Sequence, residues 1–156
     1  MSTAPALVDL APELNASQSG WNAAMGLRFV RATADEVVVE WEIGTQHMQP
    51  YGIVHGGVHA GVIETIASVG AAIHAMPRQQ AVVGLENHTS FLHAVREGVL
   101  RATARPLTRG RRTQVWEGEI RDAGGRLVAT GRVRLLGLDP EATLAGAAVG
   151  AKPSVG

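Results

Sequence analysis

The segment QPYGIVHGGVHAGVIETIAS, residues 49–68, decides the fold of this chain. At Gly56 it opens a run of about twenty residues that is apolar on nearly every side and ends at Pro77, which predicts one long helix. A helix without a polar face belongs in the interior of a fold. Burying the carboxylate of Glu64 in a bilayer would cost several kcal/mol. We therefore expect the core helix of a soluble, cytoplasmic protein.

The segments on either side of this helix carry strand patterns. Over residues 37–43 apolar and polar side chains alternate with period two, which predicts a hairpin with its turn near residues 34–35. Two strands, one buried helix and further strands indicate an α+β domain, with one antiparallel sheet wrapped around the helix. The further strand-like segments are residues 80–92, 98–109, 112–121 and 126–138.

The connections predict how these later strands are arranged. Residues 94–97, 109–112 and 122–125 are short and turn-like, and such connections favour antiparallel neighbours. Pro106 lies inside a strand, so we expect an edge or a bulge there. On the outer face we expect cross-strand ion pairs that join Glu117 and Glu119 to Arg101 and Arg105, or to Arg132 and Arg134.

Length and composition set the limits of the domain. The 156 residues correspond to one domain, which we place at residues 21–138. Residues 1–20 form an N-terminal extension that can hold a short helix around residues 6–15. Residues 139–156 are rich in alanine and glycine and are expected to form a flexible C-terminal tail.

The charge balance and the absence of cysteine exclude several classes of protein. The chain has 14 Lys+Arg against 14 Asp+Glu, so it lacks the basic excess of a nucleic-acid-binding protein or of one that adheres to anionic membranes. Without cysteine there is no disulfide framework, no thiolate nucleophile and no Cys-ligated metal. The N-terminus has neither the basic start nor the long apolar run of a signal peptide.

The glycines at the start of the helix and the glutamate within it are candidate catalytic residues. Unpaired N–H groups point out of a helix N-terminus, and glycine lets a ligand oxygen approach them closely. Gly56 and Gly57 therefore form an oxyanion site or serve close packing of helix on strand. Glu64 is a base or nucleophile, or a structural carboxylate bonded to Thr65 or Ser68.

The rise of the helix separates these two groups. At about 1.5 Å per residue, Gly56 and Glu64 lie about 12 Å apart along the axis, so one small carbonyl group cannot touch both. If both act on one bond, they come from different subunits whose helices run antiparallel about a two-fold axis. The apolar helix predicts the same partner, because the sheet covers only one of its faces.

Two other clusters have competing interpretations. His55 and His59 could form a metal site with Glu64, but the glycines between them make a poor platform, and we expect no metal. His55 is expected to hold the glycine loop, and His59 to line a pocket or pack. A Ser-His-Asp triad has no support, since there is no GxSxG motif. The second cluster is Arg109, Arg111 and Arg112. These arginines form either a solvated hairpin tip or a site that binds phosphates.

Together these residues resemble the hot-dog-fold acyl-CoA thioesterases of the phenylacetate-pathway type, near the aryl-CoA and proofreading thioesterases of menaquinone and siderophore synthesis. The resemblance covers about residues 20–138. It rests on the stretches HMQPYGIVHGG, GVIETIAS, AVVGLENHTSF, EGVLRATARPLTRGRRTQVWEGEI and GGRLVATGRVRLL. A lone HGG is a weak motif. HGG with a glutamine before it, an acid in the following helix and an arginine-rich hairpin later is specific for the family.

The resemblance implies a role for each motif residue. Glu64 corresponds to the catalytic carboxylate, and Gly56 to the backbone N–H that polarises the thioester carbonyl. Gln49 corresponds to an amide that positions the carbonyl or the attacking water, His55 to the motif histidine, and Ser68 to a hydroxyl that assists the carboxylate or water. The family builds its site between two subunits, so we expect a homodimer as the minimal unit and a homotetramer as the assembly. CoA is part of the substrate, and no cofactor is implied.

The predicted function is therefore hydrolysis of an acyl-CoA thioester to the free acid and CoA. Alternatives are a non-catalytic acyl-CoA-binding module, hydration or dehydration of an enoyl thioester, and a structural oligomerisation domain. The acyl group, aromatic or medium-chain, and the carrier, CoA or acyl carrier protein, stay open. Phe91 stands where some relatives carry a histidine. The residues expected to contact the substrate are Gly57, His59, His88, Ser90, Phe91, Arg109, Arg111 and Arg112.

Overall fold

The central helix forms where the sequence predicts it. The computed structural model describes residues 8–149, and in it α3 spans Gly56–Ala75 and is followed by the 3₁₀ turn η2, Met76–Arg78. By length and composition alone, Gly56–Arg78 could cross a membrane. Its buried side chains instead face the sheet, which contacts α3 along its length. α3 is thus the core helix of the fold, and the cytoplasmic location stays a prediction.

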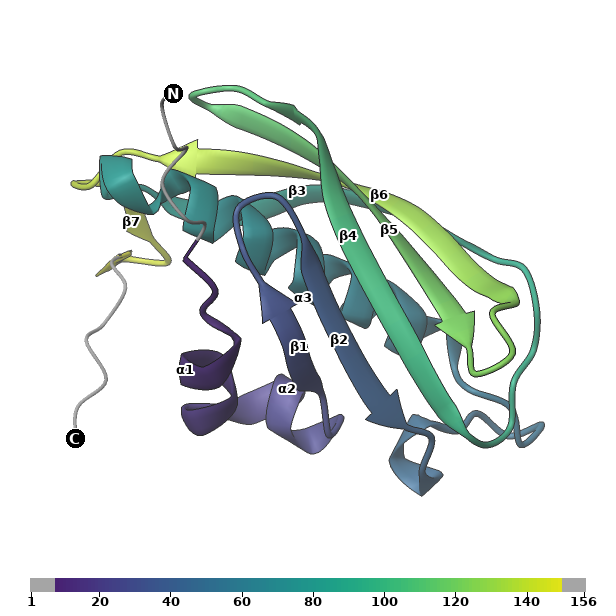
Figure 1. Cartoon of the computed structure of the whole chain (residues 1–156). Coiled ribbons are helices and arrows are strands. Elements are labelled where there is room, and N and C mark those ends of the chain that lie inside the picture. Colours follow the sequence, from purple (N-terminus) through teal and green to yellow (C-terminus); the bar gives the residue numbers. More distant parts are fainter. Residues whose placement is uncertain (1–7, 150–156) are drawn as a thin grey trace, which may run out of the picture.

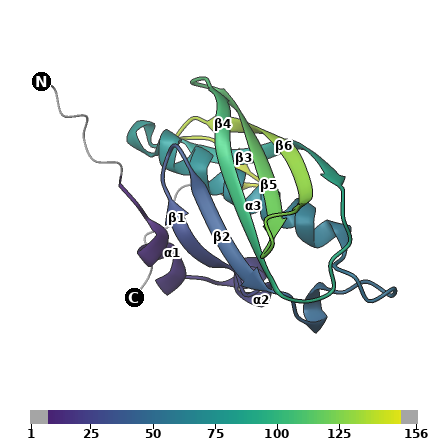
Figure 2. The same cartoon turned by 45° about the vertical axis from the view of Figure 1, so that its right-hand side comes forward.

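One antiparallel sheet curves around α3 (Figure 1), and Figure 2 shows the helix lying in its concave side. The six strands run in the order β1-β2-β4-β5-β6-β3. The predicted α+β architecture of one helix and a wrapped sheet is therefore confirmed. The strands are β1 (Arg28–Ala32), β2 (Val37–Glu42), β3 (Ala81–Phe91), β4 (Val99–Arg109), β5 (Thr113–Asp122) and β6 (Leu127–Leu138).

The position of β3 differs from the expectation that sequential strands are neighbours. β3 pairs with β6 at the edge of the sheet, whereas β4 lies between β2 and β5. The chain does not turn back after β3, because the N–H groups of Leu92 and His93 donate to Val128 O at 2.9 and 3.1 Å. Val95 O then accepts from Val54 N at 2.9 Å and draws the connection away from β3.

Pro106 lies at a bulge, as predicted. The register between β4 and β5 shifts between Pro106 and Thr108, and the pairing of β4 with β2 ends at Ala104. Because proline cannot donate a ladder hydrogen bond, the bulge and the end of the β2 pairing accommodate it without leaving a buried acceptor unpaired.

The outer face of the sheet carries ion pairs between strands, partly in the predicted combination. Glu117 pairs with Arg132 at 3.4 Å, as expected. β2 lies on the other side of β4, and its register places Glu40 opposite Arg101. Exposed pairs of this kind contribute little to stability. Pairs that the sequence did not predict include Arg28–Glu40, Arg101–Glu40, Arg105–Glu36 and Arg134–Glu86, and also Arg121–Glu119 within β5.

Two short helices precede the sheet. α1 spans Ala11–Ala16 and α2 spans Gly20–Ala24; the sequence predicted one helix around residues 6–15, of which residues 6 and 7 lie outside the described range, and did not predict α2. Trp21 of α2 lies against α3, since a Cβ atom placed on Gly61 would stand 2.6 Å from its ring. The N-terminal segment therefore packs on the side of α3 that the sheet leaves free.

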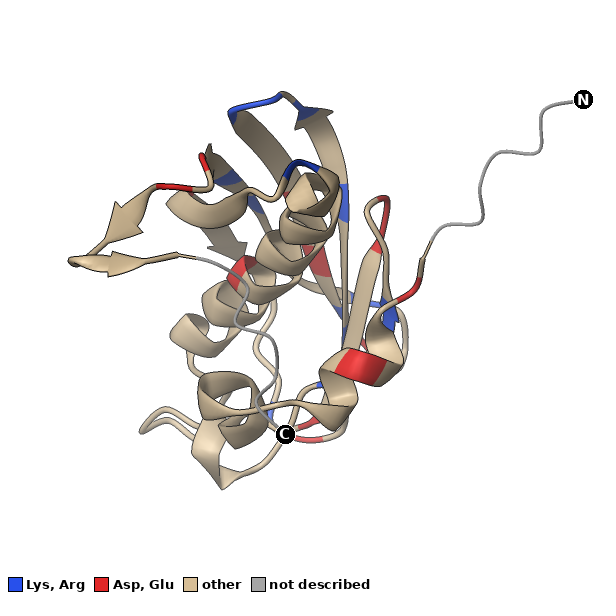
Figure 3. Cartoon of the chain, turned by 90° about the vertical axis from the view of Figure 1, so that its left-hand side faces the viewer, with Lys and Arg blue, Asp and Glu red and all other residues tan. Residues whose placement is uncertain are grey.

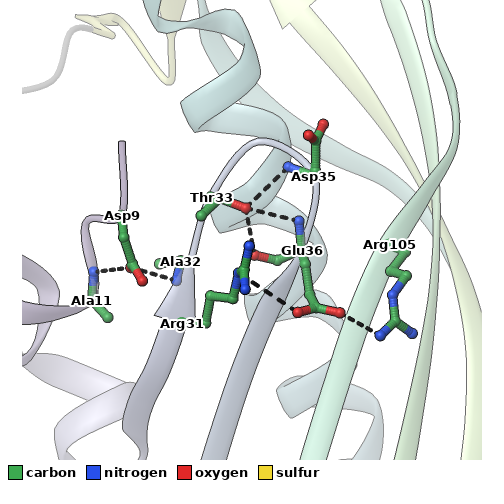
Figure 4. Close-up of polar contacts among 8 residues, drawn as sticks. All are labelled: Asp9, Ala11, Arg31, Ala32, Thr33, Asp35, Glu36 and Arg105. Carbon is green, nitrogen blue, oxygen red and sulfur yellow. Dashed lines mark hydrogen bonds and ion pairs between the residues drawn. The ribbon is translucent and has the colours of Figure 1, made fainter. Parts of the chain in front are cut away.

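Side chains tie this segment to the first hairpin (Figure 4). Asp9 Oδ1 accepts hydrogen bonds from the N–H groups of Ala11 at 3.0 Å and Ala32 at 2.9 Å, joining the start of α1 to the end of β1. Thr33 Oγ1 accepts from Glu36 N at 3.0 Å, which closes the turn between β1 and β2 where the sequence predicted it.

The C-terminal segment contains more regular structure than expected. β7 (Thr143–Leu144) and β8 (Ala147–Ala148) form a small antiparallel hairpin within the predicted tail. The rest of that tail, residues 150–156, lies outside the described range. The domain limits of residues 21–138 stay a prediction.

The core between α3 and the sheet depends on one close contact. The Trp116 side chain is fully buried, and its ring lies directly over Gly70 of α3. Gln114 links the ring to α3, because Trp116 Nε1–H donates to Gln114 Oε1 at 3.0 Å and Gln114 Nε2 donates to Ala71 O at 3.1 Å. Only glycine at position 70 lets the helix approach β5 this closely.

We predict that Gly70→Ala lowers the free energy of unfolding. A Cβ atom would stand 2.3 Å from the Trp116 ring. Overpacking of this severity costs about 3 kcal/mol, which outweighs the gain of about 1 kcal/mol in helix propensity. The net loss of about 2 kcal/mol would be measured by urea unfolding. Gly124→Ala, in an exposed turn with its nearest neighbour at 3.4 Å, is the control; a Gly70→Ala variant as stable as the wild type would contradict the prediction.

Candidate active site

The N-terminus of α3 is capped from the residue before it. His55 Nδ1 accepts a hydrogen bond from Gly57 N at 2.8 Å, and His55 O accepts from Val58 N at 2.9 Å. This is the loop-holding role that the sequence suggested for His55. Among residues 8–149, Gly56 N–H finds no acceptor. Of the first three amides of the helix, Gly56 N–H is therefore the one left to bind a ligand oxygen.

A second histidine fixes the loop that leads to the helix. His47 ends the 3₁₀ turn η1 (Thr45–His47) and is fully buried. Its Nδ1 accepts from Gly44 N at 2.8 Å, its Nε2 lies 3.0 Å from Met25 O, and its backbone oxygen accepts from His55 N at 2.8 Å. Sequence reasoning missed the role of His47, although this residue opens the stretch HMQPYGIVHGG on which the resemblance rests.

Gln49 lies at the mouth of a hollow beside Gly56. Its Oε1 accepts from Tyr51 N at 2.6 Å, which orients the side-chain amide. The hollow has a volume of about 280 Å³, and Gln49, Gly56, His59 and Phe91 are among its lining residues. The structure therefore brings together two residues predicted to be catalytic, Gln49 and Gly56, and two predicted to bind substrate, His59 and Phe91.

Glu64 lies further along α3 than Gly56 and is half-buried. Its Oε2 accepts from Asn87 Nδ2 at 3.0 Å. Asn87 also donates to Ala60 O at 3.0 Å and accepts at Oδ1 from Thr89 Oγ1 at 2.6 Å, so its amide is fixed in orientation. Gly84 leaves room for the carboxylate, because a Cβ atom there would stand 2.1 Å from Glu64 Oε1.

A second hollow opens in front of this carboxylate. Its volume is about 420 Å³, and its wall combines the small residues of α3 with one face of β3. The hydroxyl pairs considered for Glu64 are not formed: Thr65 donates to Asn22 Oδ1 at 3.3 Å, and Ser68 is half-buried nearby. The lining residues are Ala60, Gly61, Glu64, Asn87, Thr89 and Phe91.

The chain is similar to known proteins over most of its length. The family model described as the thioesterase superfamily matches residues 51–129. The chain belongs to the thioesterase superfamily. It is 35% identical over 109 residues to the 1,4-dihydroxy-2-naphthoyl-CoA hydrolase of Escherichia coli, covering 70% of this chain and 79% of that protein.

Solved structures agree. The crystal structure of AziG from S. sahachiroi is 40% identical, with a TM-score of 0.76 over 79% of this chain and 99% of that chain. A mutant thioesterase of Pseudomonas aeruginosa is 26% identical, with a TM-score of 0.78 over 82% and 93%. The fold is the hot-dog fold, and the protein is a thioester hydrolase.

Within one chain of this thioesterase, the two candidate catalytic groups face different hollows. Gly56 lines the first and Glu64 the second, and Phe91 lies at the border of both. A Cβ atom on Gly56 would stand 2.8 Å from the Phe91 ring, so this ring closes the direct path along the helix. The separation expected from the helix rise is thus reinforced by a side chain.

Two residues predicted to bind substrate, His88 and Ser90, lie on the face of β3 opposite the hollow of Glu64. His88 and Ser90 alternate with Asn87, Thr89 and Phe91, which line the hollow of Glu64. A bulge between Gly84 and Glu86 shifts the register of β3, and therefore the phase of its alternation. Asn87 and Thr89 are the residues that sequence reasoning missed, although their period-two spacing from Phe91 was the available signal.

The arginines of the β4–β5 tip lie at the other end of α3 from Gly56 (Figure 3). Arg109 is occupied: its Nη1 donates to Ala34 O at 2.8 Å and to Asp35 Oδ1 at 2.5 Å. Arg111 and Arg112 are exposed. Within one chain, these residues are not brought together with the hollow of Gly56.

His59 is the unusual titratable group of the site. Burial lowers the pKa of His59 to about 4, because the interior disfavours the charged imidazolium. The ring is 3% exposed. The folded thioesterase therefore holds it neutral at pH 7.

We predict that His59 makes the thioesterase acid-sensitive. Between pH 6.5 and 4 the unfolded chain binds a proton at His59 and the folded chain does not, so stability falls as the pH falls, by up to about 3 kcal/mol. His59→Leu should remove this part of the pH dependence. The free energy of unfolding of both proteins, measured at pH 7 and pH 4.5 at one protein concentration, checks it; parallel pH profiles would refute it.

Proposed function

We propose that this thioesterase hydrolyses an acyl-CoA thioester to the free acid and CoA. The observation that carries the proposal is the position of Glu64, the one carboxylate of α3, at an open hollow with its orientation set by Asn87. The similarity to a hydrolase of 1,4-dihydroxy-2-naphthoyl-CoA supports a CoA thioester as the substrate.

The proposed reaction uses two groups on α3, the backbone N–H of Gly56 and the carboxylate of Glu64. Gly56 N–H, unpaired at the helix N-terminus, stabilises the oxyanion that develops on the thioester carbonyl. Glu64 takes a proton from water as general base, or attacks the carbonyl itself to give a mixed anhydride that water then opens. The C–S bond breaks, and the thiolate of CoA leaves and takes up a proton. Gln49 and Ser68 position the carbonyl and the water.

The complete site requires two chains. Gly56 and Glu64 of one chain lie about 12 Å apart along the rigid helix, with Phe91 between their hollows. In a homodimer with antiparallel α3 helices, Gly56 of each chain meets Glu64 of the other. A pair of such dimers gives the homotetramer. The exposed guanidinium groups of Arg111 and Arg112 are the candidates for the CoA phosphates.

We predict that Glu64→Gln lowers kcat by about 10²- to 10⁴-fold, because the amide can neither accept a proton nor attack. Release of the CoA thiol from aryl, medium-chain and short-chain acyl-CoA measures the effect. Glu117→Gln, which removes an exposed carboxylate that pairs with Arg132 alone among residues 8–149, is the matched control. Acyl-CoA binding without turnover in the wild type would instead support a non-catalytic binding module.

Comparing Gly56→Pro with Gly56→Ala separates the effect of the backbone N–H at position 56 from the effect of an added Cβ. Proline is tolerated at the first position of a helix and lacks the N–H, and His55 already has the extended backbone that proline requires before it. Gly56→Ala places a similar Cβ against Phe91 but keeps the N–H. We expect kcat to be about 10²- to 10³-fold lower in Gly56→Pro than in Gly56→Ala; equal rates would rule out the N–H as an oxyanion donor.

Mixing inactive chains tests the two-chain site. In a heterodimer of Glu64→Gln with Gly56→Pro, one site keeps both intact groups and the other has neither. Random pairing of equal amounts should therefore restore about one quarter of the wild-type rate. A site built within one chain would give no recovery, since every site would carry one defect.

A further inference from the structure

Arg96 binds two neighbouring backbone oxygens rather than a carboxylate. Its Nη1 donates to Tyr51 O and to Gly52 O, each at 2.9 Å, and so joins the connection between β3 and β4 to the loop before α3 (Figure 1). Among residues 8–149 it has no ion-pair partner. Because a charged donor makes a stronger hydrogen bond than a neutral one, this contact holds the two segments together.

The part of the loop that Arg96 binds is a tight turn. Gly52 N donates to Gln49 O at 2.9 Å. Pro50 suits the second position of such a turn, and Gly52 adopts a φ of +69°, which favours glycine. The Tyr51 side chain is 82% exposed, so its ring does not hold the turn in place. The turn is held to the neighbouring segment by hydrogen bonds, and the Arg96 guanidinium supplies two of them.

The same turn fixes the direction of the Gln49 side chain. Tyr51 N donates to Gln49 Oε1 at 2.6 Å. Because a backbone N–H can only donate, the amide oxygen must face Tyr51, which leaves Nε2, with two N–H donors, as the end of the amide that can reach a ligand. Gln49 and Gly56 line the same hollow. The turn therefore determines that Gln49 offers that hollow a donor, as Gly56 N–H does.

We propose that Arg96 is a positioning residue that acts on the reaction through Gln49. The inference rests on the proposed function, in which Gln49 positions the thioester carbonyl. Arg96 holds the carbonyl of Tyr51, and the N–H of Tyr51 in turn holds Gln49 Oε1. Without Arg96 the turn can tilt, and the Gln49 amide can rotate until its oxygen faces the developing oxyanion. Misplacement of a donor by about 1 Å slows a reaction by about tenfold or more.

The first test is kinetic and uses an acyl-CoA that the wild type hydrolyses. Arg96→Met keeps an unbranched side chain but removes its donors. We expect kcat to fall about tenfold while KM changes by less than about threefold, because the misplaced donor acts mainly in the transition state. Arg96→Lys, which keeps a charged donor for one carbonyl, should recover part of the loss. Arg132→Met, which removes an exposed arginine that pairs with Glu117, is the matched control and should keep the wild-type rate.

A double-mutant cycle separates a role through Gln49 from a merely structural one. If Arg96 acts through Gln49, Arg96→Met lowers kcat in the wild type but has no further effect in a Gln49→Ala background. Losses that multiply overturn the inference, as does an unchanged kcat in Arg96→Met or in Gln49→Ala. Urea unfolding checks that each variant is folded.

Failure of the proposed function gives a different result: either Glu64→Gln keeps the wild-type rate, or no acyl-CoA is hydrolysed. In the first case the cycle still decides the role of Arg96. In the second, crystal structures of the wild type and of Arg96→Met decide it. We expect Gln49 Oε1 to accept from Tyr51 N in the wild type and to lose this bond in Arg96→Met; an unchanged bond in Arg96→Met overturns the inference.

Discussion

The structure depends on one rigid element, α3, which packs against the sheet on one side and carries the proposed catalytic carboxylate on the other. The side facing the sheet is held by apolar contacts, the closest of which sets Trp116 against Gly70. The other side carries Glu64 at an open hollow, and the first turn carries the unpaired N–H of Gly56. Because the helix cannot bend between them, the packing that stabilises the core also fixes the distance between the two proposed catalytic groups.

His47, His55 and His59 show how surroundings assign different roles to one residue type. His47 is saturated with hydrogen bonds and holds the loop. His55 uses Nδ1 to cap Gly57 and thereby leaves Gly56 N–H free. His59 is buried, and its Nδ1 has no hydrogen-bond partner among residues 8–149. A motif written as H-G-G-x-H does not distinguish these environments.

Sequence predicted those features that arise from local patterns. An apolar run of helical length and period-two alternation mark burial directly, so α3, the six strands and the hairpin turn at Thr33 were foreseen. The order of the strands was not, because hydrogen bonds from Leu92 and His93 to Val128 decide where the chain goes after β3. The face of β3 at the site was also missed: Asn87 and Thr89, spaced by two from Phe91, line the hollow of Glu64, whereas His88 and Ser90 do not.

The open edge of the sheet connects assembly to catalysis. β3 has a neighbour on one side only and exposes Leu85 and Phe91, at 51% and 58%. An exposed apolar edge strand invites pairing with another chain. In the proposed dimer, covering this edge and the free side of α3 also brings Gly56 of one chain to Glu64 of the other. The same burial would then stabilise the assembly and complete the site, so a chain with a correct fold but no partner would lack activity.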